Sequence, residues 1–276
     1  LDVSAEGTAF PGRWYDTFAP RLGFPASGIL HEIRCARDAP ARVLLTMARP
    51  DQRQPIRLSA AVAAEGTRYA DLVFRDIQGN IELTPKDLSF SNIEATTTAG
   101  DKLALDLRID FQPLAVTIRN AHVVGHPELV STFIDDRDAK AIYRRVWQDF
   151  RWDSGHPAAI DLRQLAYRET PGGRTWRLTM DASLQAEQAT YRDLPVKRLD
   201  ATVGLDLPER VEVRSARLES DTAVDEGHVT ILTGANPKCT FEVRHVQGGQ
   251  DPARILRLLN PEWGGVLGPL VFSPDS

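Results

Sequence analysis

The stretch Leu103–Phe111, LALDLRIDF, alternates between large apolar residues and small or charged ones. The odd-numbered positions are Leu103, Leu105, Leu107, Ile109 and Phe111, and the even-numbered positions between them are Ala104, Asp106, Arg108 and Asp110. Successive side chains of a β-strand point to opposite faces of its sheet, so this period of two predicts a strand with one apolar and one charged face. Nine residues at about 3.3 Å each span roughly 30 Å, which is long for a globular strand. What the apolar face contacts therefore decides both the fold and the function.

The same alternation recurs from Ile56 to Val243 and predicts a mainly β protein. In two places the alternation changes phase without ending, between Phe90 and Ile93 and between Leu162 and Leu165. A β-bulge inserts one residue into a strand and reverses the facing of the residues that follow. We therefore expect bulges at these two places, within strands that continue through them.

A tandem repeat is the strongest signal in the sequence. The segment RYADLVFRDIQGNIEL resembles TYRDLPVKRLDATVGL, so that Tyr69 and Tyr191 stand 122 residues apart. Two weaker similarities flank this block. One places Arg119 over Arg244, 125 residues apart, and the other places Phe18 under Phe150, 132 residues apart. The chain is therefore expected to be a tandem array that begins and ends within a unit.

The repeat divides the chain into three expected parts, namely the end of one unit at 1–55, a central unit at 56–177 and a following unit at 178–276. Each unit is expected to be a long, curved antiparallel sheet, forming an open groove or half-barrel, with a short helical insert at its end. The inserts are expected at about 127–150 and about 252–270. Pro127 suits a first helical turn, and an apolar i, i+3, i+4 pattern follows it. Covering a sheet edge is at least as good an explanation of such an insert as a role in recognition.

The charge pattern disfavours nucleic acid as a partner. The formal net charge is −5, and the basic and acidic residues are mixed along the chain, with no cluster of four or more basic residues. No run of 18 apolar residues is present, and the first residues lack the pattern of a signal peptide. The chain also lacks an initiator Met, so we interpret it as a piece of a longer polypeptide. The two cysteines, Cys35 and Cys239, are expected to be unpaired thiols on strands rather than a disulfide.

Candidate catalytic and metal-binding residues are few. His122 and His126 are the only closely spaced histidines, but Pro127 places them at the end of a strand, where a spacing of four does not bring two ligands together. No nucleophile elbow, phosphate-binding loop or dinucleotide-binding motif occurs. The sequence therefore predicts no enzyme, no metal and no cofactor, although a catalytic triad assembled in space stays open.

The repeat resembles a known family. A Tyr-x-Asp-Leu motif at Tyr69–Leu72, the strand Asp76–Leu83, the segment LSFSNIEA at Leu88–Ala95 and the turn into the long strand Gly100–Phe111 resemble the repeat of AsmA-like proteins of the Gram-negative envelope, relatives of TamB and YhdP. The second copy departs from the motif, since Asp200–Thr202 stands where the first copy has Gln78–Asn80.

This resemblance implies a repeating β-groove with an apolar interior, anchored in the inner membrane by a segment elsewhere in the parent chain and extending through the periplasm. It implies phospholipid, or another acyl-chain ligand, as cargo moved between the inner and outer membranes in support of outer-membrane integrity. The residues expected to line the groove are Leu103, Leu105, Leu107, Ile109, Phe111, Val203, Leu205 and Leu207. Two alternatives stay open: a dry β module that scaffolds envelope assembly, and a carbohydrate-binding or hydrolytic envelope protein.

Overall fold

A computed structural model describes residues 2–7, 33–35, 41–48, 57–69, 72–126, 129, 144, 150–153, 155–169, 175–191, 194–221, 223–232 and 238–248. The strands are β1 (Asp2–Gly7), β2 (Ile33–Cys35), β3 (Ala41–Ala48), β4 (Arg57–Tyr69), β5 (Leu72–Leu83), β6 (Asp87–Thr97), β7 (Lys102–Phe111), β8 (Leu114–Gly125), β9 (Phe150–Trp152), β10 (Ala158–Glu169), β11 (Trp176–Tyr191), β12 (Leu194–Leu207), β13 (Arg210–Glu219), β14 (Ala223–Leu232) and β15 (Lys238–Gly248).

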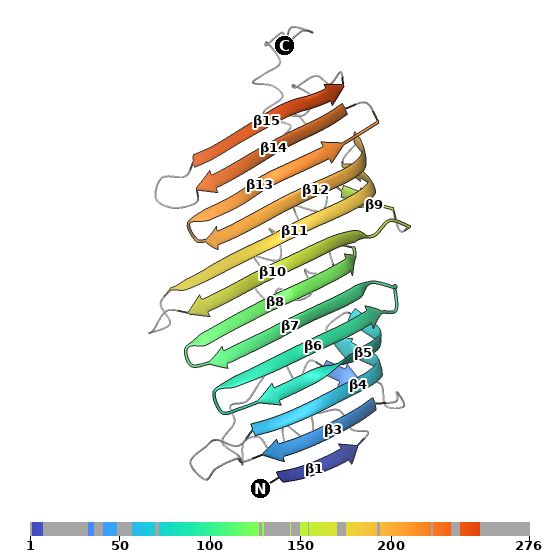
Figure 1. Cartoon of the computed structure of the whole chain (residues 1–276), viewed down its shortest axis with the longest axis vertical. Helices are drawn as coiled ribbons and strands as arrows, with labels where there is room; N and C mark the ends of the chain where they lie inside the picture. The colour runs from blue at the N-terminus through green and yellow to red at the C-terminus, as the bar shows by residue number, and fades with distance from the viewer. Residues whose placement is uncertain are drawn as a thin grey trace.

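All of these strands belong to one antiparallel sheet (Figure 1). The main path runs in chain order from β1 through β3 to β8 and from β10 to β15, while β2 pairs with β4 and β9 pairs with β11. β1 and β15 stand at opposite ends of the path, so the sheet is open, and its strands bend as they cross it (Figure 1). The prediction of a mainly β fold made of a long open antiparallel sheet is confirmed.

The topology has a period of seven strands. β8 pairs with β10 as β1 pairs with β3, and β9 pairs with β11 as β2 pairs with β4. The register gives the same result at residue level, because Tyr69 lies opposite Leu72 and Tyr191 lies opposite Leu194. The 122-residue repeat is therefore a repeat of structure. Residues 56–177 contain β4 to β10, which is one complete period.

The register corrects the two weaker alignments. Ile118 and Phe241 occupy equivalent positions, opposite Leu107 and Val229, so the offset there is 123 and not 125. Phe150 has Ile33 as its equivalent, because β9 and β2 each pair opposite the repeated tyrosine. The alignment of Phe150 with Phe18 was wrong: it followed a shared aromatic residue, whereas equivalence in a sheet is set by the hydrogen-bonded ladder.

Both predicted bulges are present. The register of β6 against β7 shifts between Phe90 and Ile93, and that of β10 against β11 shifts between Leu162 and Gln164. Asn92 has a positive φ of 52° within the first bulge, and its backbone N–H donates to the Asp106 carboxylate at 2.8 Å. The strands continue through these positions because a bulge changes the facing without ending the ladder.

The helical inserts fall largely outside the described residues. Of the segment 127–150, the structure describes Leu129, Arg144 and Phe150, and it describes none of 252–270. Phe150, expected at the end of the first insert, begins strand β9 instead, because its backbone pairs with Tyr191. Both cysteines lie on strands, as predicted, with Cys35 on β2 beside β4 and Cys239 on the far edge strand β15.

Candidate functional site

Strand β7 has the two faces that its sequence predicts. All five large apolar side chains of Leu103–Phe111 belong to hydrophobic clusters. The charged side chains make polar contacts instead. Asp106 accepts a hydrogen bond from the backbone of Asn92, and the Arg108 Nε donates to Asp110 at 3.0 Å. The apolar faces of neighbouring strands thus form one continuous side of the sheet here, which we call the floor. The predicted site residues of β7 lie on this floor.

The half of β7 nearest the β7–β8 hairpin packs into a closed cluster. Four residues of this cluster form one row across four strands, since each lies directly opposite the next: Leu58, Leu83, Leu88 and Ile109. Their exposed fractions are 3%, 3%, 0% and 5%. Leu107 and Phe111 pack against the same cluster and are half-buried. We call these four residues the first row.

The other half of β7 packs into a second cluster. Leu103 is buried together with Phe74, Ala95 and Val123, and Leu105 packs against them. Leu129, which follows β8 in the chain, is 6% exposed and belongs to the same cluster. The apolar face at Leu103 is therefore covered in part by a residue from outside the sheet.

The equivalent row in the second repeat is more open. Met180, Leu205, Val211 and Ile231 also lie opposite one another across four strands, and we call them the second row. The first three are half-buried and Ile231 is 38% exposed. The predicted site residues Val203 and Leu207 flank Leu205 on the same strand and are half-buried.

A buried carboxylate interrupts the apolar face of the second repeat. Leu103 lies opposite Ala95 and Val123, and at the equivalent position Asp225 lies opposite Leu218 and His245. Asp225 is 7% exposed. Aligning the two repeats strand by strand therefore identifies this aspartate as the residue that replaces Leu103 on the apolar face.

An aromatic group anchors β9 against β11. The rings of Phe150 and Trp152 stack with centroids 5.1 Å apart, and Phe150 meets Tyr191 at 4.6 Å. The core beside them consists of small and branched residues, among them Leu184, Val196 and Leu199. The closed core of the second repeat therefore lies next to β9, away from the second row.

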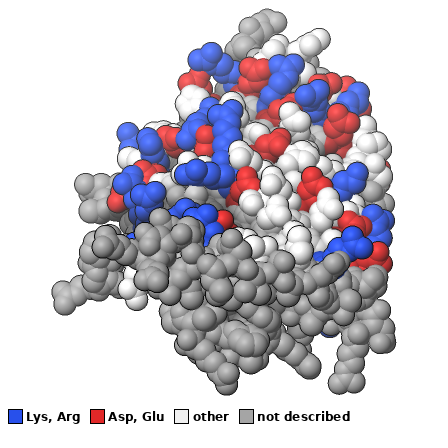
Figure 2. Space-filling view, turned by 60° about the horizontal axis from the view of Figure 1, so that its bottom comes forward, with Lys and Arg blue, Asp and Glu red and all other residues white. Residues whose placement is uncertain are grey.

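The opposite face of the sheet is charged but locally neutralised. In the upper part of the view in Figure 2, Lys and Arg are intermixed with Asp and Glu. The Arg177 guanidinium donates two hydrogen bonds to the Asp206 carboxylate, each of 2.8 Å, and this contact lowers the pKa of Asp206 and raises that of Arg177. A shallow hollow over β11–β15 contains Arg214, Arg217 and Arg244, and each of these arginines pairs with a carboxylate.

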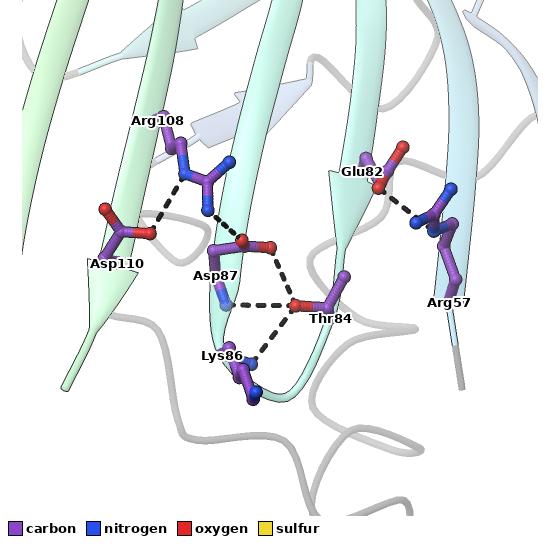
Figure 3. Close-up of polar contacts among 7 residues, drawn as sticks. All are labelled: Arg57, Glu82, Thr84, Lys86, Asp87, Arg108 and Asp110. Carbon is purple, nitrogen blue, oxygen red and sulfur yellow. Dashed lines mark hydrogen bonds and ion pairs between the residues drawn. The ribbon is translucent and has the colours of Figure 1, made fainter. Parts of the chain in front are cut away.

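The same pattern holds at the β5–β6 hairpin (Figure 3). Thr84 Oγ1 accepts the N–H groups of Lys86 and Asp87 and donates to the Asp87 carboxylate at 2.7 Å. Arg108 bridges the carboxylates of Asp87 and Asp110, and the hydrogen bond that it donates to Asp110 is the main reason that the pKa of Arg108 is raised. These contacts join neighbouring strands and fix the turn.

The two closely spaced histidines have separate partners. The His122 Nδ1 lies 2.6 Å from the Asp161 carboxylate, across the β8–β10 pair, whereas the ring of His126 meets Trp152 edge-on. Among the described residues, no group of three or more His, Cys, Asp or Glu side chains is placed to hold a metal ion.

The fold defines the class of protein as an open antiparallel β-sheet built from tandem seven-strand units. No protein-family model, curated protein or solved structure matches the chain. In the part of the chain that the structure describes, no helix is long and apolar enough to cross a membrane.

Proposed function

We propose that this chain is a lipid-conducting section of a periplasmic β-groove of the AsmA-like type, whose apolar face holds phospholipid acyl chains. The observation that carries the proposal is the recurrence of apolar rows along this face, which Asp225 interrupts at one position of the second repeat. Cross-strand rows of apolar side chains occupy equivalent positions in both repeats of one open sheet. Such a face extends by repetition, which suits a ligand that has to be shielded over a long distance.

The physical need for such a face follows from acyl-chain solubility. Transfer of one methylene from water to an apolar surface is worth about 0.8 kcal/mol, so a sixteen-carbon chain exposed to water costs on the order of 12 kcal/mol. A conduit that lowers this cost needs an extended apolar surface and no reactive group. The charged face then forms the outer surface toward solvent, and ion pairs with carboxylates neutralise four of its arginines, namely Arg177, Arg214, Arg217 and Arg244.

Within this section, the second row is the expected contact site for an acyl chain. The first row is already buried, with Leu88 fully inaccessible, so a ligand gains little by contacting it. Leu205, Val211 and Ile231 present apolar surface that is still partly exposed to water. The apolar side chains of Val203 and Leu207 extend this surface along β12.

Native mass spectrometry tests the proposal. The chain is incubated with vesicles of phosphatidylethanolamine and phosphatidylglycerol, separated from them and sprayed under gentle conditions. We expect bound phospholipid on the unaltered chain and its loss in Leu205→Asp, which places a charge in the second row. Ser215→Asp, which adds the same charge at an exposed position of β13, is the matched control and should keep the lipid. Equal retention by both variants would place the lipid elsewhere.

A dry structural module is the second candidate function, because the first row is closed. Side chains that are 0–5% exposed are typical of a permanent core. If the unaltered chain carries no phospholipid in the same experiment while its circular dichroism shows a folded β protein, the scaffold function is favoured over lipid conduction.

A further inference from the structure

The last strand of the described sheet, β15, pairs along one edge only. β15 is 11 residues long, contains no proline and pairs with β14 on one side, and in the part of the chain that the structure describes it has no second neighbour. Natural edge strands are commonly short or carry proline or inward-pointing charges, which prevent another strand from pairing with their free N–H and C=O groups. A long edge without proline is a template for strand addition.

The seven-strand period predicts which type of strand pairs with this edge of β15. β15 is the equivalent of β8, because the two strands lie opposite equivalent residues, Ile231 and Ile109. β8 pairs on its other edge with β10, as β1 pairs with β3. The edge of β15 is therefore equivalent to an interface that occurs twice in this molecule.

We infer that the free edge of β15 is a docking site for an antiparallel strand of the β3 and β10 type, supplied by a further unit of the same repeat. The repeat also argues against head-to-tail pairing of two copies of the described sheet. The strand that a second copy would offer is β1, which occupies the same place in the period as β15 itself and not the place of β10. This inference does not depend on what the apolar face binds.

The register of the docked strand follows from β8 and β10. Tyr167 lies opposite Val116, and Val116 is equivalent to Cys239 because each lies opposite the isoleucine of its repeat. In the docked complex, the residue at the Tyr167 position of the incoming strand therefore lies opposite Cys239. Residues directly opposite in an antiparallel pair are close enough to form a disulfide, and a shift of one residue turns the side chain to the other face.

Disulfide trapping tests both the docking and the register. The probe is a peptide of the β10 sequence AAIDLRQLAYRE carrying Tyr167→Cys as an activated disulfide, added to the full chain with Cys35→Ser so that Cys239 is its single thiol. Peptides with Ala166→Cys or Arg168→Cys are the matched controls. We expect the first peptide to couple about tenfold faster than either control, because position 167 alone stands directly opposite position 239 in the expected register. Coupling should also slow amide hydrogen exchange in β15.

A second pair keeps the test independent of the environment of Cys239. Ala159 lies opposite Val124, whose equivalent is the exposed Gln247, so a peptide with Ala159→Cys should couple fastest to a Gln247→Cys chain from which both native cysteines are removed. Equal coupling by matched and mismatched peptides in both pairs would overturn the inference. So would β15 amides that are already protected on both edges in the chain alone, or a stable head-to-tail dimer in light scattering at micromolar concentration.

Discussion

At the scale of single residues, the two repeats place different residue types at a position with the same left-handed backbone conformation. Gly66 and Gln188 occupy equivalent positions 122 residues apart, and their φ angles are 60° and 53°. The left-handed region costs an L-residue roughly 1–2 kcal/mol through contact between Cβ and the carbonyl oxygen, whereas glycine enters it freely. The second repeat therefore carries local strain that the first avoids.

The glutamine can be replaced to remove that strain. Gln188 is exposed, so Gln188→Gly loses little packing and should raise the free energy of unfolding by about 0.5–1 kcal/mol. The reciprocal change, Gly66→Ala, should lower it by about 1 kcal/mol. Urea denaturation of both variants measures the effect, and a lower stability for Gln188→Gly would show that the glutamine side chain makes a contact that outweighs the strain.

Single residues also account for places where the chain cannot vary. A Cβ on Gly79 would clash with the Cδ1 of Ile93 and lie 3.0 Å from its Cα, and Ile93 forms part of the neighbouring bulge. The bulge brings the two backbones together, and only glycine leaves room for it. The second repeat has Ala201 at this place in the alignment, in keeping with the departure of its motif from that of the first.

At the scale of strands, the important unit is the cross-strand row. The first and second rows have the same register and differ in burial, so the same residue type can be compared in two environments. Leu83 is 3% exposed in the first row, and its equivalent Leu205 is half-buried in the second. A comparison of the two rows therefore separates the contribution of strand pairing to stability from the contribution of side-chain burial.

Two alanine variants make this comparison directly. Leu83→Ala should lower the free energy of unfolding by about 2–5 kcal/mol, because it leaves a cavity in a closed cluster. Leu205→Ala should cost about 1 kcal/mol, since the lost methyl groups are partly hydrated already. Denaturant titration of the lipid-free chain measures both. Equal losses of unfolding free energy in the two variants would mean that the second row is buried in solution and is not available to an acyl chain.

At the scale of the whole molecule, the sheet is a one-dimensional array in which each strand contacts its neighbours on the path. The stability of such an array is approximately a sum of local and nearest-neighbour contributions, so damage in one unit spreads little. The buried clusters follow this arrangement: one lies within the first repeat at β4–β8, and another lies around β9–β13.

Hydrogen exchange should show this independence. In Leu83→Ala, backbone amides of β4–β7 should exchange faster, while those of β12–β14 keep the rates of the unaltered chain. The measurement is peptide-level exchange read by mass spectrometry, with Leu205→Ala as the reciprocal control. A uniform acceleration across all strands would instead indicate that the sheet unfolds as a single cooperative unit.

The sequence alone determined the strands, their faces and the repeat, because these depend on local periodicity. The apolar side chains of LALDLRIDF lie in hydrophobic clusters, and its charged side chains make polar contacts. The bulges after Phe90 and Leu162 occur where the alternation of apolar and polar residues changes phase. The weaker alignments failed because similar residues can recur out of register.

Only the tertiary structure decided which apolar residues are covered. Leu83 and Leu205 occupy equivalent places on equivalent strands, yet the first is buried and the second is partly open. The structure likewise placed β9 against β11 and Asp225 on the floor of the second repeat. The physical reason is that periodicity fixes the direction in which a side chain points, whereas burial depends on what distant parts of the chain bring against it.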